Sequence, residues 1–327
     1  MTSIFPNNPP SIAVIIPAYR VEREIEQVIK TLPAEIRHII VVNDASPDGT
    51  DAIVTRLSSE EPRLVYLRHE SNQGVGGAMV TGFRKGLELN ADIIIKMDGD
   101  GQMDPGLIPR LIEPLVQGKA DYTKGNRFRD TVALRQMPAI RRLGNAMLSF
   151  LAKAATGYWN IFDPTNGFLA IRSEVLTQLP LEKLDHTFFF ETSMLAQLYL
   201  IDACVQDVPM PARYGDQPSN LRIHRILLDF PPRIFDTMMK RLILKHLLYD
   251  FSMMSIYMLA GIPLFLFGLI FGIIKWIHYA SIGVPAPTGT VVLPMICVLL
   301  GVQFLLSAIQ IDLQSVPRSP LTAPIHN

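Results

Sequence analysis

The chain has 327 residues with 30 basic and 30 acidic side chains, so its formal net charge is zero. A dedicated nucleic-acid-binding protein usually shows a basic excess, and this chain has none. Its apolar content of 49% excludes a disordered chain and a collagen-like repeat. The two cysteines, Cys204 and Cys297, exclude a disulfide framework and favour a reducing compartment.

Charge is distributed unevenly along the chain. Residues 251–327 contain only three of the 60 charged side chains, namely Lys275, Asp312 and Arg318. Residues 1–250 contain the other 57, a density ordinary for a soluble domain. We therefore expect a globular domain followed by a membrane segment. The expected parts are a globular domain (1–230), an amphipathic juxtamembrane helix (231–250), a hairpin (251–311) and a cytoplasmic tail (312–327).

Two stretches, about 251–274 and 288–311, each run for 24 residues without a formal charge. As helices they would reach ~36 Å, enough to cross a ~30 Å hydrocarbon core. A pair of buried core helices is the alternative, but the length and the lack of charge favour two transmembrane helices. The basic residues Arg233, Lys240, Arg241 and Lys245 precede the first stretch. The positive-inside rule therefore predicts a cytoplasmic globular domain, in agreement with the absence of a signal-peptide pattern at the N-terminus.

In the first half of the chain, apolar runs alternate with helical patterns. Strands are expected at residues 11–17, 38–43, 64–68 and 92–97, and helices at 21–32, 50–58 and 74–89. This alternation predicts an α/β fold with a mostly parallel sheet, in which ligands bind beyond the carboxyl ends of the strands. Polar residues gather at these ends, in 17–19, 43–50 and 98–102.

The residues at these strand ends bear on two classes of cofactor, a nicotinamide dinucleotide and a divalent metal ion. Gly74, Gly76 and Gly77 follow the third strand, whereas a dinucleotide fingerprint follows the first, so a nicotinamide enzyme is rejected. Asp98 and Asp100 follow the fourth strand, with Gln102 beside them. These are hard oxygen ligands of the kind that Mg²⁺ or Mn²⁺ prefers, although such a triplet also occurs on solvated turns.

The chain closely resembles the family 2 glycosyltransferases with the GT-A fold, in particular the polyprenyl-phosphate (dolichol-phosphate-type) hexosyltransferases that carry a two-helix membrane anchor. The resemblance covers about residues 11–225. It is carried by IIPAY (15–19), VVNDASPDGT (41–50), NQGVGGAMVTGFRKG (72–86), KMDGDGQMDP (96–105), GNRF (125–128), DPTNGF (163–168) and FFFET (188–192).

The resemblance implies roles for individual residues. The residues implied to bind the nucleotide sugar are Pro17, Ala18, Tyr19, Glu22, Asp44, Asp98, Gly99, Arg127 and Arg213. Asp98, Asp100 and Gln102 are implied as metal ligands. Asp44 would accept a hydrogen bond from the base, although a turn or helix cap also explains an aspartate there. The chain departs from the family pattern at Arg20-Val21, where Glu22 is the substitute for a glutamate, and at Asn220, where Arg222 is the substitute for a lysine.

The implied reaction is inverting, metal-dependent transfer of a hexose, with UDP-glucose favoured, to polyprenyl (undecaprenyl or dolichyl) phosphate. Asp163, Asp100 and Arg127 are the expected catalytic residues, with Asp163 or Glu191 as a base if one is needed. The expected contacts to the acceptor phosphate are Arg129, Arg141, Arg142 and Arg222. A helix over 138–155 could present arginines to a lipid bilayer, or be a plain domain helix with a solvated basic face.

The bacterial inner membrane is the favoured location, and a homo-oligomer is expected. A GDP-mannose-dependent mannosyltransferase is an alternative. So is an enzyme acting on a hydroxyl, although no Arg-Trp pair of a polysaccharide synthase occurs. A silent scaffold is the third alternative, and the intact Asp98, Asp100 and Gln102 argue against it.

Overall fold

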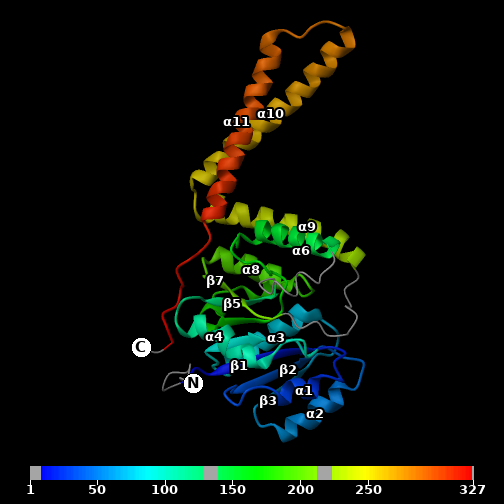
Figure 1. Ribbon diagram of the computed structural model, residues 1–327, viewed down its shortest axis with the longest axis vertical. Coiled ribbons are helices and arrows are strands. Elements are labelled where there is room, and N and C mark those ends of the chain that lie inside the picture. Colours follow the sequence, from blue (N-terminus) through cyan, green and yellow to red (C-terminus); the bar gives the residue numbers. More distant parts are fainter. Residues whose placement is uncertain (1–8, 128–138, 212–222, 326–327) are drawn as a thin grey trace. The chain divides into compact units, whose positions relative to one another are not determined.

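The computed structural model describes residues 9–127, 139–211 and 223–325 and divides into two compact units (Figure 1). The first unit comprises residues 1–238 together with 317–327. The second comprises residues 239–316. The last residues of the chain therefore belong to the same unit as the sheet, after an excursion through the second unit.

The first unit is built on a sheet for which the described residues supply seven strands. These are β1 (Ile12–Ala18), β2 (His38–Asn43), β3 (Leu64–Arg68), β4 (Ile93–Lys96), β5 (Tyr122–Asn126), β6 (Leu169–Arg172) and β7 (Val205–Pro209). The order is β3-β2-β1-β4-β6-β5-β7; β6 is antiparallel to both of its neighbours, and the other pairs are parallel. The mostly parallel α/β sheet expected from the sequence is confirmed.

Helices cover both faces of this sheet (Figure 1). The described helices from the start of the chain to residue 243 are α1 (Ile25–Lys30), α2 (Thr50–Glu60), α3 (Gly74–Glu88), α4 (Ile108–Val116), α6 (Ala139–Thr156), α7 (Ser173–Leu176), α8 (Phe190–Leu200) and α9 (Ile223–Ile243), with short turns η1 (Pro105–Leu107) and η3 (Leu181–Lys183). Of these, α2, α3, α4 and α7 contact the strands directly. Alternate side chains of a strand point to opposite faces. Val14 and Ile16 accordingly lie in a core cluster with α1 and α4, while Ile15 packs on α3. Both faces are apolar because both are covered.

The last residues of the chain pack on the sheet unit. Asp121, which has no exposed surface, accepts hydrogen bonds from Leu321 N (2.9 Å), Thr322 N (3.2 Å), Thr322 Oγ1 (2.9 Å) and Cys204 N (2.8 Å). Arg172 donates to the carbonyl of Ala323. The segment expected as a cytoplasmic tail is thus bound to the sheet unit through a buried carboxylate.

In the second unit, α10 (Met253–Ile282) and α11 (Thr288–Gln314) pack against each other along their length, following the π-helical turn η4 (Leu244–Tyr249). Within the described residues, these are the two helices that are long and apolar enough to cross a membrane. Arg241, before α10, forms a two-point ion pair with Asp312 near the end of α11. The two helices therefore form a hairpin whose ends lie together.

Candidate active site

The first side of the site is the carboxyl end of β1. Pro17 and Ala18 close the strand, and the Tyr19 side chain that follows is 43% exposed. Arg20 adopts a left-handed backbone (φ 57°), and its N–H donates to Ser46 Oγ at 2.7 Å. Its guanidinium lies 5.5 Å from the centroid of the Tyr19 ring. The turn thus presents an aromatic face and a cation at one strand end.

Asp44, at the end of β2, holds the N-terminus of α3. Its Oδ1 accepts from Gln73 N (2.8 Å) and its Oδ2 from Gly74 N (2.8 Å). His69 Nδ1 lies 2.7 Å from Oδ1, and His69 Nε2 lies 2.9 Å from Thr81 Oγ1. A carboxylate has roughly four acceptor sites, so these bonds leave little capacity for a base. The contact of Asp44 with a base stays a prediction, while its capping of α3 is a feature of the structure.

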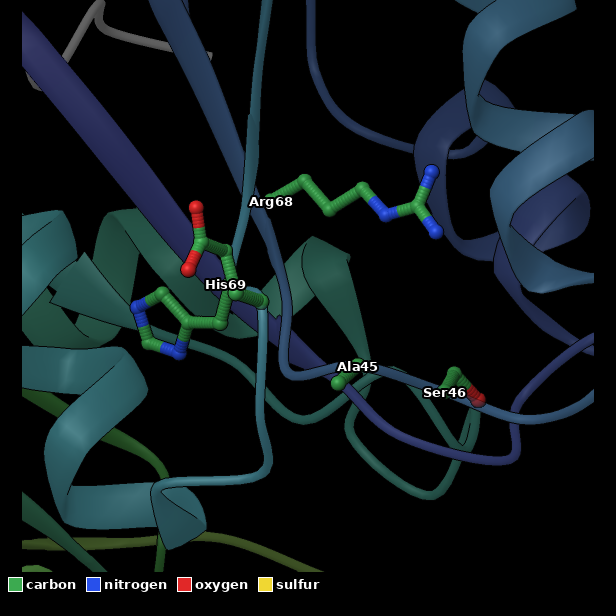
Figure 2. A pocket seen from close by; sticks show the side chains of 5 residues that line it. Ala45, Ser46, Arg68 and His69 are labelled. Atoms are coloured by element: carbon green, nitrogen blue, oxygen red, sulfur yellow. The ribbon is translucent and has the colours of Figure 1, made fainter.

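A hollow of about 310 Å³ opens beside Asp44, at the ends of β2 and β3 (Figure 2). Its lining residues are Ala45, Ser46, Arg68, His69 and Glu70. Figure 2 shows Arg68 extending away from the His69 ring, and the Arg68 guanidinium binds Asp51 Oδ2 at 3.0 Å. The hollow therefore lies at the edge of the sheet where parallel α/β folds bind their ligands.

Glu22 supports this same edge. Its Oε2 accepts from Gly49 N at 2.7 Å, and its own N–H donates to Asp48 Oδ2 at 3.2 Å. Asp48 also accepts from Thr50 N at 3.2 Å, at the start of α2. Glu22 thus fixes the loop that precedes α2, and its contact with a nucleotide stays a prediction.

Asp98 and Asp100 follow β4, and both are half-buried. The backbone N–H of Gln102 donates to Asp100 Oδ1 at 3.0 Å, which closes the turn. Burial, together with neighbouring Asp98, raises the pKa of Asp100 above its ordinary value. Among the residues that the structure describes, no group of three or more His, Cys, Asp or Glu side chains forms a complete metal site. The neighbouring carboxylates of Asp98 and Asp100 are ligands of the kind that fit Mg²⁺ or Mn²⁺, which complete their shells with substrate phosphates. The side chain of Gln102 as a third ligand stays a prediction.

A buried lysine lies beneath these carboxylates. Lys96, the last residue of β4, is 1% exposed, and its Nζ lies 2.6 Å from Asp98 Oδ1 and 3.3 Å from Glu191 Oε1. Glu191 lies in the first turn of α8. Burial alone would lower the pKa of Lys96, but Asp98 and Glu191 outweigh it and the pKa is raised. The sequence motifs did not predict a role for this lysine. The one sequence feature that indicates a role is a single charged residue inside an apolar strand.

Arg127, directly after β5, is held by Asp163. Arg127 Nε lies 2.8 Å from Asp163 Oδ2 and Nη2 lies 3.1 Å from Oδ1, and the backbone N–H of Arg127 also donates to Oδ2. The Asp163 side chain has no exposed surface, whereas that of Arg127 is 40% exposed. This geometry supports a role for Asp163 in orienting Arg127 toward a ligand.

Two further charged residues lie near this pair, the buried Lys124 and the half-buried Asp207. Burial lowers the pKa of Lys124 to about 8, and its Nζ donates to the carbonyl of Asn166. Burial raises the pKa of Asp207 to about 6. Its Oδ2 accepts from Asn126 Nδ2 and from Phe162 N, each at 2.8 Å. The loop that carries Asp163 is thus tied to β7.

Some expected site residues cannot be placed. Arg129, Arg213 and Arg222 lie outside the described residues. Arg141 and Arg142 lie in the first turns of α6, which matches the helix expected over 138–155, but their side chains are outside the description. The structure therefore places Asp98, Asp100 and Gln102 on one turn and pairs Arg127 with Asp163. The metal-binding role of the first three residues and the role of the acceptor-side arginines stay predictions.

Comparison with known proteins identifies the family. Residues 13–179 match the family described as glycosyl transferase family 2. The chain belongs to this family. It is therefore a glycosyltransferase, and its sheet with the acidic turn after β4 is the family's GT-A catalytic fold.

Two named relatives are 34% and 30% identical to this glycosyltransferase over their aligned residues. A UDP-N-acetylglucosamine–dolichyl-phosphate N-acetylglucosaminyltransferase from Methanococcus voltae is 34% identical over 181 residues, which is 51% of this chain and 72% of the relative. An undecaprenyl-phosphate mannosyltransferase from Micrococcus luteus is 30% identical over 206 residues, 61% of this chain and 82% of the relative.

Among solved structures, the chain is similar to glucosyl-3-phosphoglycerate synthase from Mycobacterium tuberculosis, crystallised with Mn²⁺, UDP-glucose and phosphoglyceric acid. The TM-score is 0.50 at 21% identity, covering 71% of this chain and 79% of the other. At this identity the likeness bears on the fold alone.

Proposed function

We propose that this glycosyltransferase moves a hexose from a nucleotide-diphosphate sugar to a polyprenyl phosphate. One observation carries the proposal: a family 2 catalytic domain and a hairpin of two membrane-length apolar helices occur in one chain. The names of the two relatives differ in the sugar but share a polyprenyl-type phosphate acceptor. A lipid acceptor also explains why the catalytic domain would be attached to a membrane.

An exposed apolar surface near Arg127 supports a lipid acceptor. Met147 and Phe150 of α6 are 59% and 60% exposed, and Phe162 is 46% exposed. Phe162 directly precedes Asp163, so this surface continues to the ion pair between Asp163 and Arg127. Contiguous exposed apolar side chains on a soluble domain mark interaction sites. A lipid approaching over this surface would bring its phosphate toward the Arg127 guanidinium.

The chemistry needs little base catalysis. A phosphate monoester has a second pKa of ~6 and is mostly dianionic at neutral pH, so its oxygen is already a nucleophile. This oxygen bonds to the anomeric carbon as the bond from that carbon to the diphosphate breaks, and the departing nucleoside diphosphate takes the electron pair. A single displacement inverts the anomeric configuration.

Stabilising the departing diphosphate is the larger task. Asp100, with Asp98 and Gln102, would hold a divalent cation, which as a Lewis acid neutralises charge on the diphosphate when bound. Arg127 offers a second, fixed cation whose direction is set by Asp163. Tyr19 and the loop after β2 would bind the base and ribose at the hollow beside Asp44.

Several nucleotide sugars are candidates for the donor. UDP-glucose is the favoured donor, with GDP-mannose as the alternative, and the relatives add UDP-N-acetylglucosamine to the candidates. We further propose that both α10 and α11 cross the membrane and that the catalytic domain lies on the cytoplasmic face, with the bacterial inner membrane favoured. The tail bound to Asp121 fits two crossings, which return the chain to the side that it left.

The test is transfer by the full-length protein in detergent or in membranes. Undecaprenyl phosphate and dolichyl phosphate are each incubated with radiolabelled UDP-glucose, UDP-N-acetylglucosamine, UDP-galactose or GDP-mannose. One donor is expected to give a labelled lipid that resists mild alkali, as a phosphodiester does. Asp100→Ala should abolish the product. A protein that labels no polyprenyl phosphate but labels a lipid hydroxyl, or that gives the same product after Asp100→Ala, would contradict the proposal.

A further inference from the structure

The turn that follows β4 and carries Asp98 and Asp100, here called the acidic turn, is held in place by one buried cation. Lys96 is the last residue of β4, and three oxygens lie within hydrogen-bonding or ion-pair distance of its Nζ: Asp98 Oδ1 (2.6 Å), Glu191 Oε1 (3.3 Å) and Gly167 O (3.4 Å). The ammonium group has three protons, so each can be directed to one of these acceptors. The three acceptors come from three different segments, namely the turn after β4, the first turn of α8 and the residues before β6.

The space around the ammonium is closed by a glycine. A Cβ added to Gly167 would lie 2.5 Å from Lys96 Nζ and 2.6 Å from Asp98 Oδ2. The lysine and the aspartate therefore occupy the volume that any larger residue would need. Because Lys96 is 1% exposed and Glu191 8% exposed, water cannot replace the ammonium as their partner.

We propose that Lys96 is the positioning residue of the donor site, fixing Asp98 and Glu191 so that the acidic turn is assembled before a divalent cation and a nucleotide diphosphate bind. Asp98 is held by the ammonium, and Asp100 lies two residues later on the same turn, where its Oδ1 accepts from Gln102 N. Lys96 itself does not touch the substrate. The inference rests on the proposed use of Asp98 and Asp100 for a metal–nucleotide donor.

Lys96 would act by orienting the carboxylates of Asp98 and Glu191. A carboxylate that binds a metal or a ribose is effective only in one rotamer, and groups that hold such ligands in place usually contribute 10–100-fold to metal affinity or activity. Without Lys96, Asp98 and Glu191 would lose a common cation and repel each other across a poorly hydrated space. Asp98 would then turn toward solvent, and the site would have to be reassembled on each binding event.

Lys96→Met tests this directly, because methionine has a similar length without the charge. Binding of Mn²⁺ alone is measured by electron paramagnetic resonance. Binding of UDP or GDP in the presence of Mn²⁺ is measured by calorimetry. Both measurements use the full-length protein. We expect the affinity for the Mn²⁺–nucleotide pair to fall by about 10–100-fold. Lys30→Met, which removes an exposed lysine paired with Glu26 on α1, is the matched control and should leave binding unchanged.

A second variant perturbs the contact with both charges present. Gly167→Ala places a methyl group against Lys96 Nζ and Asp98 Oδ2, so it should weaken Mn²⁺–nucleotide binding in the same direction. Gly289→Ala is its control, since a Cβ there meets nothing within 4 Å. A merely structural role would lower the melting temperature and the fraction of active protein but leave the dissociation constant of the folded protein unchanged.

The outcomes separate the two proposals. A folded Lys96→Met or Gly167→Ala protein that binds Mn²⁺ and nucleotide with wild-type affinity overturns the positioning role of Lys96. If the wild-type protein binds the pair but transfers no sugar to polyprenyl phosphate, the proposed function fails while the role of Lys96 can still be measured. If the wild-type protein binds no Mn²⁺–nucleotide pair, both fail.

Discussion

Asp163 and Arg127, 36 residues apart in the chain, form a two-point ion pair in which the carboxylate is fully buried and the guanidinium reaches the surface. The planar guanidinium matches a carboxylate with two parallel bonds, which fixes its plane as well as its position. Arg127 is therefore oriented before a ligand arrives. The loop that carries Asp163 is itself fixed, because Phe162 N donates to Asp207.

Asp163→Asn should lower kcat by about 10²-fold, because an amide group presents a donor to one of the Arg127 nitrogens and the guanidinium loses its fixed direction. The measurement is steady-state sugar transfer with a range of donor concentrations. Arg127→Met provides the reference. If Asp163 acts only through Arg127, the double variant will be no slower than Arg127→Met; a further loss in the double variant would show a direct role for Asp163.

The binding of the C-terminal residues to Asp121 leads to a prediction on stability. Ending the chain after Val316 removes Leu321 N and both Thr322 donors from a buried carboxylate. Leaving a buried acceptor without its donors costs about 1–3 kcal/mol, and more for a charged group, so the catalytic domain should melt at a clearly lower temperature. Thr322→Val removes one hydroxyl donor and should cost about 1 kcal/mol. An unchanged melting temperature in the shortened protein would contradict a stabilising role of these residues.

The half-buried Asp207 predicts a pH dependence of stability. Its folded-state pKa of about 6 lies above its ordinary value of 3.8. Between about pH 4 and 6 the folded protein holds a proton that the unfolded chain has lost, so its contribution to the free energy of unfolding falls as the pH rises through this window.

Asp207→Asn should remove this slope and stabilise the protein at pH 7 by about 1–2 kcal/mol, since each pKa unit corresponds to about 1.4 kcal/mol and the site is partly exposed. Thermal unfolding of the full-length protein in detergent, measured from pH 4 to pH 8, checks this. Asp202→Asn, on the turn before β7, serves as the comparison. A variant that keeps the wild-type slope would show that another group is responsible.

The ion pair between Arg241 and Asp312 predicts non-additive effects in the hairpin. Both side chains are buried, at 2% and 4% exposure, and the pair joins the segment before α10 to the end of α11. Asp312→Ala or Arg241→Ala leaves one charge buried and should destabilise by about 3–5 kcal/mol. The double variant should lose less than the sum, which a double-mutant cycle of unfolding in detergent measures. Strictly additive losses would mean that the two residues do not stabilise each other.

Much of the fold was predictable because its signals are local. The first four strands lie close to their expected bounds, since buried parallel strands read as short apolar runs. The helix expected at 74–89 is α3 (Gly74–Glu88), and that at 21–32 is the shorter α1 (Ile25–Lys30). The helix expected from residue 231 begins earlier, at Ile223, and runs through Pro231 and Pro232. The pattern of β5, β6 and β7 depends on pairing between distant segments and was not predicted.

The candidate site was predictable where its residues follow a strand directly. Asp98, Asp100 and Gln102 could be named from the sequence because an apolar strand followed by polar residues predicts a ligand edge. The partners of Lys96, Asp44 and Asp163 could not, because each lies far along the chain or on another element. Glu191, for example, meets Lys96 across 95 positions only because the tertiary fold brings the first turn of α8 to the end of β4.

The sequence by itself determined the class of fold, the family and the presence of two membrane-length helices, because periodicity, motif order and unbroken apolar length are properties of neighbouring residues. Only the tertiary structure decided which charges neutralise each other: Lys96 with Asp98 and Glu191, Arg127 with Asp163, and Asp121 with the end of the chain. The reason is physical. A charge can be buried only beside a partner, and the partner is chosen by the packing of whole elements rather than by distance along the chain.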